Sequence, residues 1–131
     1  MTPVLGGEND ALRTILVADD NHDVVFIVSQ VLESAGYTVV SAHSVREALD
    51  LLDEKKEIEL VLSDVRMPGQ DGFDLLRVLR HRFPAMPVIL MTGLPITDDD
   101  IVPAGASILQ KPIDIDELER VVKEKVGQRS H

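Results

Sequence analysis

The stretch that decides the fold is TILVADDN, residues 14–21. Its first five residues are apolar or β-branched throughout, which is typical of a strand buried inside a parallel sheet. Two acidic residues, Asp19 and Asp20, follow at once, and Asn21 can cap a helix that starts behind them. This order predicts a strand-to-helix unit with a polar site at the end of its strand.

Outward from this unit, apolar runs of strand length alternate with helical patterns along the chain. The further runs lie at residues 37–42, 58–63, 87–91 and 107–110. Apolar spacing predicts helices that begin near Asn21, Ser44 and Asp114, and another over residues 75–83. Such alternation indicates right-handed βαβ units. We therefore expect an α/β, flavodoxin-like (βα)5 three-layer sandwich with a five-stranded parallel sheet of order 2-1-3-4-5.

The length and composition restrict the class of protein. The 131 residues suit one compact domain, and no cysteine is present, which excludes disulfides and thiolate metal sites and fits a cytoplasmic location. With 23 acidic and 13 basic residues, the net charge of -10 argues against direct binding to nucleic acid or to an anionic membrane. The apolar runs are also too short for a membrane-spanning helix.

Polar groups follow four of the predicted strands. They are the pair Asp19 and Asp20, then Asp64, Thr92 and Lys111. The carboxyl ends of parallel strands meet at one edge of a sheet, where open α/β sheets bind ligands. Carboxylates packed within about 4 to 6 Å repel by up to ~4 kcal/mol per pair at an effective dielectric constant near 20, so they need a cation. Oxygen ligands without nearby histidine or cysteine favour Mg2+.

This arrangement suits phosphoryl chemistry. Asp64 is the candidate nucleophile, because carboxylates can attack phosphorus and form aspartyl phosphates. Mg2+ on Asp20 and Asp64, together with the Lys111 ammonium, would neutralise charge on the transferred group. The backbone N–H groups of Arg66 and Gly93 could hold its oxygens. No glycine-rich phosphate loop of the Walker or dinucleotide type is present, which disfavours nucleotide binding.

Each of these residues also has a purely structural interpretation. Asp20 could cap the first helix, Asp64 and Thr92 could belong to ordinary turns, and Lys111 could be a solvated lysine. Their convergence at one sheet edge favours the functional interpretation. The pair at residues 71–72, Asp-Gly, is interpreted as a structural turn. The four histidines lack metal-ligand spacing, so no role is assigned to them.

Four segments carry a family resemblance. ILVADDN (residues 15–21), SDVRMPGQDG (63–72), MTG (91–93) and QKP (110–112) together resemble the receiver domain of two-component response regulators, over about residues 14–126. The resemblance implies that Asp64 is the phosphoacceptor, Thr92 the switch hydroxyl and Lys111 the phosphate-binding cation. It also implies Mg2+ beside the acidic pair Asp19 and Asp20, held by the second acid of the pair, by Asp64 and by the main-chain carbonyl of Arg66.

The implied function is signalling. Asp64 would take a phosphoryl group from a sensor histidine kinase or a histidine phosphotransfer protein, and the surface would then change for an unidentified output partner. Such a domain assists its own phosphorylation and dephosphorylation but is not an enzyme for external substrates. We expect a flexible leader (residues 1–12), the receiver domain (13–127), a flexible tail (128–131) and, from the resemblance, a cis Lys111–Pro112 bond. An aspartyl-phosphate hydrolase and a non-phosphorylated pseudo-receiver adaptor are the alternatives.

Two departures from the family pattern affect the expected output. Ile108 stands where many receivers carry a tyrosine or phenylalanine that rotates inward, so the usual aromatic switch cannot operate. We expect the loop after Thr92 to carry the signal instead. Pro95 and Pro103 predict a fourth helix that is short, displaced or absent. These features resemble receivers of hybrid histidine kinases, whereas residues 64–69 resemble receivers of transcriptional activators, and both attachments stay open.

Overall fold

The computed structural model describes residues 13–67, 69, 72–93 and 106–129. Five strands form one parallel sheet of order β2-β1-β3-β4-β5. The strands are β1 (Thr14–Ala18), β2 (Thr38–Ala42), β3 (Ile58–Asp64), β4 (Val88–Thr92) and β5 (Ala106–Gln110). The predicted α/β, flavodoxin-like fold and its strand order are confirmed.

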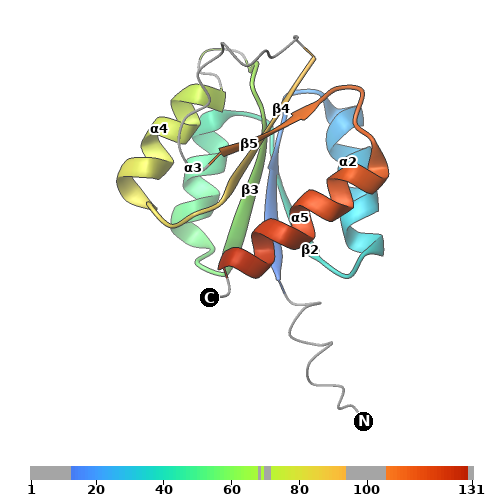
Figure 1. The fold of residues 1–131 in the computed structure, drawn as a ribbon. Coiled ribbons are helices and arrows are strands. Elements are labelled where there is room, and N and C mark those ends of the chain that lie inside the picture. The colour runs from blue at the N-terminus through green and yellow to red at the C-terminus, as the bar shows by residue number, and fades with distance from the viewer. Residues whose placement is uncertain (1–12, 68, 70–71, 94–105, 130–131) are drawn as a thin grey trace.

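Helices cover both faces of the sheet and complete three layers (Figure 1). In the described part of the chain, one face carries α2 (His22–Ser34) and α5 (Ile115–Arg129), and the other carries α3 (Val45–Glu54) and α4 (Gly72–Arg82). The central strands β1, β3 and β4 therefore lie between two apolar layers. This explains why the central strands carry runs of consecutive apolar residues, such as residues 15–18 and 60–62, rather than alternating apolar and polar residues.

Side-chain caps fix the starts of three helices where the sequence predicts them. Asn21 accepts hydrogen bonds from two backbone N–H groups in the first turn of α2. The Ser44 hydroxyl accepts one from Glu47 N at 3.1 Å, and the Asp114 carboxylate accepts one from Glu117 N at 3.1 Å. These bonds satisfy N–H groups that have no partner inside the helix. The caps also set where the chain turns away from the carboxyl ends of β1, β2 and β5.

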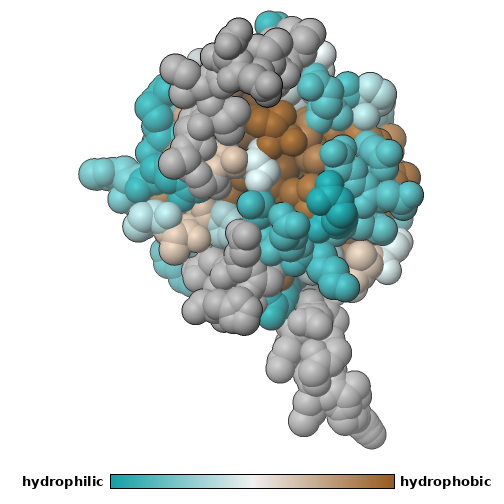
Figure 2. Space-filling model, in the orientation of Figure 1, coloured by the Kyte–Doolittle hydropathy of each residue, from teal (hydrophilic) through white to brown (hydrophobic). Residues whose placement is uncertain are grey.

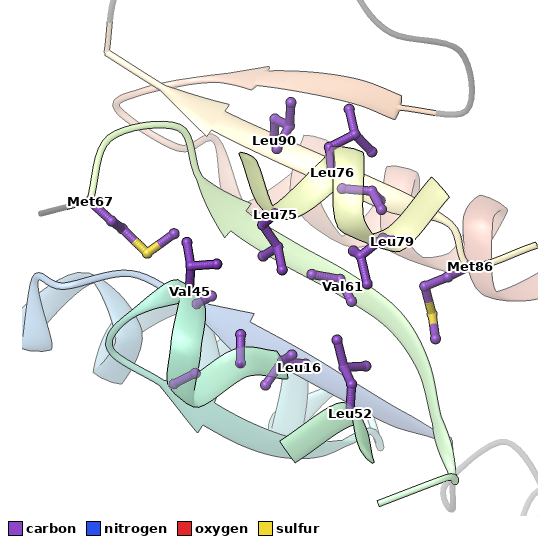
Figure 3. Close-up of a cluster of buried hydrophobic side chains, with 14 of the residues drawn as sticks. Leu16, Val45, Leu52, Val61, Met67, Leu75, Leu76, Leu79, Met86 and Leu90 are labelled. Atoms are coloured by element: carbon purple, nitrogen blue, oxygen red, sulfur yellow. The ribbon is translucent and has the colours of Figure 1, made fainter. Parts of the chain in front are cut away.

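Two hydrophobic clusters, one on each face of the sheet, form the core. Strand β1 contributes to both, because successive side chains of a strand point to opposite faces: Leu16 packs on the α3 and α4 side, and Ile15 on the other. In Figure 3, Leu75 and Leu79 of α4 lie over Val61 of β3. Each fully buried leucine contributes about 1.5 to 3 kcal/mol to stability.

Strand β5 forms one edge of the sheet and is less covered than the central strands. Its residues Ala106, Ser107 and Ile108 are half-buried, whereas β4 is buried throughout.

In the view of Figure 2, hydrophobic residues are visible near the middle of the molecular surface. None of the described helices combines the length and the apolar composition that crossing a bilayer requires.

Some of the sequence predictions fall outside the described residues. They include the leader (residues 1–12), the end of the tail, and the segment in which we expect a short, displaced or absent fourth helix. Helix α5 itself runs to Arg129. The receiver boundaries at residues 13 and 127 stay predictions.

Gly72 begins α4 directly against the end of β3. Its backbone N–H donates to the Val65 carbonyl oxygen at 2.7 Å. A Cβ atom at this position would lie 2.5 Å from the Asp64 carbonyl oxygen and 3.0 Å from Val65 Cα. Both are backbone atoms, which cannot swing aside as a flexible side chain could. A larger residue at position 72 would therefore displace the strand end that carries Asp64.

We predict that Gly72→Ala lowers the free energy of unfolding by about 1 to 3 kcal/mol, because overpacking against fixed backbone outweighs the helix propensity gained with alanine. Chemical denaturation measures the change. Gly93→Ala is the matched control, since a Cβ there meets nothing within 4 Å, and it should shift stability by no more than about 0.5 kcal/mol. Equal effects of the two substitutions would show that the close approach at Gly72 is unimportant.

Candidate functional site

The site begins with three carboxylates at the carboxyl edge of the sheet, near the top of Figure 1. Asp19 and Asp20 follow β1, and Asp64 is the last residue of β3. Because β1 and β3 are paired neighbours, one carboxylate oxygen from each of the three residues lies within 4.8 Å of the others. Asp19 and Asp64 are buried, whereas Asp20 is exposed. The cluster therefore has a buried floor and an open side.

Lys111 brings a positive charge into this cluster. Its Nζ atom lies 3.1 Å from Asp19 Oδ2 and 3.1 Å from Asp64 Oδ1, so it bridges the two buried carboxylates. The residue follows β5, and its backbone N–H donates to the Thr92 carbonyl oxygen at 2.7 Å. The Lys111–Pro112 bond is cis, as predicted. The ladder between β4 and β5 thus continues to the residue whose ammonium enters the site.

The pKa values follow from burial and from these contacts. Burial, which is the largest effect, and the Asp19 charge raise the pKa of the Asp64 carboxyl above its ordinary value, against the opposing effect of Lys111. For Lys111, burial acts to lower the pKa, but the hydrogen bonds to Asp64 and Asp19 outweigh it and the pKa is raised. Lys111 therefore stays charged at neutral pH. The cluster contains three acidic side chains and one basic side chain, so acidic groups are in excess.

The donor set fits a divalent cation that prefers oxygen. Carboxylates are hard ligands, and the ligand oxygens of an octahedral Mg2+ lie within about 4.2 Å of one another, twice the metal–oxygen distance. The acidic cluster is close to this size. The exposed carboxylate of Asp20 leaves the site accessible to a metal with bound water. The excess of acidic groups in the cluster also favours cation binding.

The other predicted site residues lie on the neighbouring strands. Thr92 is buried at the end of β4, next to β3, and Gly93 follows it at the surface. Arg66 is exposed, two residues beyond Asp64. Ile108 is half-buried on β5 and packs against the cluster under α3 and α4. The structure thus brings Asp19, Asp64 and Lys111 into direct contact, while the backbone roles of Arg66 and Gly93 and the switch roles of Thr92 and Ile108 stay predictions.

Three supporting residues were missed by the sequence analysis. The Ser63 hydroxyl donates to the Asp64 carbonyl oxygen at 2.9 Å, and Gly72 allows the close approach to that same carbonyl. The His43 Nδ1 atom lies 3.2 Å from the Asp19 carbonyl oxygen. The sequence position of His43 could have indicated its role. His43 directly follows the strand predicted at residues 37–42, and the predicted strand order places that strand beside the one that leads to Asp19.

Comparison with known proteins agrees with this geometry. The family model "Response regulator receiver domain" matches residues 15–123. The chain is 35% identical over 116 residues to the DNA-binding transcriptional regulator NtrC of Escherichia coli (strain K12), a match that covers 86% of this chain and 24% of NtrC. The chain therefore spans about a quarter of the length of this relative.

Solved structures show the same likeness. A response regulator receiver domain protein from Clostridium thermocellum superposes with a TM-score of 0.84 at 31% identity, over 91% of this chain and 98% of that one. The receiver domain from the hybrid histidine kinase CckA gives a TM-score of 0.75 at 34% identity, over 86% and 98%. With the family model matching most of its length, the chain belongs to the response regulator receiver domains of two-component systems.

Proposed function

We propose that this receiver domain, residues 13–127, accepts a phosphoryl group on the Asp64 carboxylate in a reaction that requires Mg2+. The observation that carries the proposal is the shared contact of Lys111 with Asp19 and Asp64 inside an acidic cluster of metal-binding size. The Lys111 ammonium and a bound divalent cation would together provide the positive charge that an incoming phosphoryl group requires.

The donor in this proposal is a phosphohistidine of a sensor histidine kinase or of a histidine phosphotransfer protein. An oxygen of Asp64 attacks phosphorus, the phosphorus–nitrogen bond breaks, and its electron pair leaves with the imidazole. Asp20, Asp64 and the Arg66 carbonyl would hold Mg2+ beside Asp19, and the metal would supply positive charge that neutralises phosphoryl charge. Lys111 would shift from the carboxylates toward the phosphoryl oxygens, and the N–H groups of Arg66 and Gly93 would bind the others.

The proposed output is a change of surface that another protein segment recognises. With a net charge of -10, the domain itself is unsuited to binding DNA, so any DNA-directed output would come from a further domain or partner. Thr92 and the chain that follows it would carry the change, because Ile108 has no ring or hydroxyl to exchange between solvent and pocket. The proposal keeps the cytoplasmic location predicted from the lack of cysteine.

The two alternatives are less well supported. Family membership favours a signalling domain over an aspartyl-phosphate hydrolase that acts on external substrates. The contact of Lys111 with Asp64 is an arrangement that a binding adaptor without phosphorylation would not need.

The assignment of Asp64 predicts a single site of modification. Incubation with a small-molecule phosphodonor and Mg2+ should add one phosphoryl group, detected by intact mass spectrometry, and none to the Asp64→Asn variant. Asp74→Asn is a suitable control, because Asp74 is an acidic residue of α4 that pairs with Arg77, and it should be labelled like the parent. Equal labelling of the Asp64→Asn variant would contradict the proposal.

The metal proposal predicts that Asp20→Asn weakens Mg2+ binding, because it removes an exposed, charged oxygen ligand from the cluster. Isothermal titration calorimetry gives the dissociation constant directly. Asp23→Asn serves as the control, since this residue lies in the first turn of α2 and outside the acidic cluster. If the Asp20→Asn variant binds Mg2+ as tightly as the parent, Asp20 is not a ligand.

The raised pKa of Asp64 predicts a pH-dependent stability without Mg2+. A carboxyl whose pKa is raised by folding favours the folded state when protonated, so this stabilisation is lost as the pH rises above the unfolded value of 3.8 and through the folded pKa. Metal-free Asp64→Asn should therefore be more stable than the parent at neutral pH, with the difference vanishing as the pH falls. Denaturation at several pH values tests this, and a constant difference would contradict it.

A further inference from the structure

A hydrogen bond from a histidine ring reaches the turn that carries the acidic pair. His43 follows β2 directly, and its Nδ1 atom lies 3.2 Å from the main-chain carbonyl oxygen of Asp19. A carbonyl oxygen can only accept, so Nδ1 must carry the hydrogen and donate it. The peptide that links Asp19 to Asp20 is thereby tied to the end of the neighbouring strand.

The His43 ring is itself fixed in place. It stacks on the ring of His22, with centroids 4.1 Å apart and planes at 19°. Its backbone N–H donates to Glu47 Oε1 at 2.7 Å, and Glu47 N donates in turn to the Ser44 hydroxyl. The cap of α3 therefore restrains the His43 backbone, and the first residue of α2 packs against its ring. A donor held in this way has little freedom to leave its acceptor.

The bonds around Asp19 leave its peptide groups few alternative orientations. Asp19 N donates to the Ala42 carbonyl oxygen at 3.0 Å, and Asn21 N donates to Asp19 Oδ1 at 2.9 Å. The His43 bond adds the third restraint, on the carbonyl directly before Asp20. Asp20 is the exposed carboxylate of the cluster, so the orientation of its backbone decides where its oxygens lie relative to Asp64.

We propose that His43 is a positioning residue for cation binding: its Nδ1–H bond to the Asp19 carbonyl holds the Asp20 carboxylate at the distance from Asp64 that a divalent cation requires. The inference rests on the proposed function, because it assumes that Asp20 and Asp64 share a metal. Residues that orient metal ligands through hydrogen bonds change metal affinity without touching the metal.

Two substitutions separate the hydrogen bond from the ring. His43→Phe keeps a stacking ring but removes the donor, whereas His43→Asn removes the ring but places an amide N–H donor where Nδ1 stands. We expect His43→Phe to weaken Mg2+ binding about 3- to 10-fold, because it loses the hydrogen bond that orients a metal ligand. His43→Asn should keep that bond and bind Mg2+ within about 2-fold of the parent. Calorimetric titration with Mg2+ measures both. His81→Phe, at an exposed position on α4, is the control and should bind like the parent.

Each outcome of the Mg2+ titrations either supports or contradicts the proposed role of His43. If His43→Phe binds Mg2+ like the parent, or if His43→Asn is weakened as much as His43→Phe, the hydrogen bond does not position the site and the proposal is wrong. If the parent itself does not bind Mg2+, the proposed function fails first, which the unmodified protein reveals without any variant. Thermal melting of each variant shows whether it is folded.

The tautomer of His43 gives a test that needs neither metal nor a variant. Neutral histidine carries its hydrogen on one ring nitrogen, and the proposed bond requires this to be Nδ1. Long-range 1H–15N spectra of the full chain, recorded above the pH range in which histidine titrates, distinguish the two forms. We expect His43 to be protonated at Nδ1 and the exposed His81 not to be held in that form. A His43 ring protonated only at Nε2 overturns the proposal even if His43→Phe fails to fold.

Discussion

The repulsion among the carboxylates of Asp19, Asp20 and Asp64 is the constraint on which the rest of the site depends. One oxygen from each of the three lies within 4.8 Å of the others, and burial of two of the groups strengthens the repulsion. Lys111 compensates one charge by contacting both buried carboxylates. A phosphoryl group would bring further negative charge to the same place. Under the proposed function, the domain would accept it only with a cation present, which would link metal binding to phosphorylation.

The parallel sheet provides the geometry for this charge cluster. Asp19 and Asp64 come from the ends of adjacent strands, β1 and β3, and Lys111 follows β5, beyond β4. Backbone hydrogen bonds continue the β3–β4 and β4–β5 pairings past the strand ends, from Val65 N to the Met91 carbonyl and from Lys111 N to the Thr92 carbonyl. The side chains of the site thus stand on a rigid edge. The apolar layers on both faces keep that edge in register.

The sequence predicts the fold and the main site because both depend on local patterns. Apolar runs mark the strands, and Asp64 and Lys111 stand at their ends, so strand order alone brings them together. The contacts of His43, Ser63 and Gly72 could not be predicted in this way. They depend on the orientation of the His43 ring, on the rotation of the Ser63 hydroxyl, and on a backbone approach at Gly72 that leaves no room for a Cβ atom. Patterns of residue type carry no information on distances at that scale.

A crystal structure of the domain with Mg2+ and beryllofluoride, a phosphoryl mimic, tests most directly whether this edge is a phosphorylation site. Beryllium should bond to an Asp64 carboxylate oxygen, with Mg2+ on Asp20 and Asp64 and the Lys111 ammonium turned from the carboxylates to a fluoride. Beryllofluoride bound to another residue, or Mg2+ bound away from the cluster of Asp19, Asp20 and Asp64, would contradict this assignment of the site.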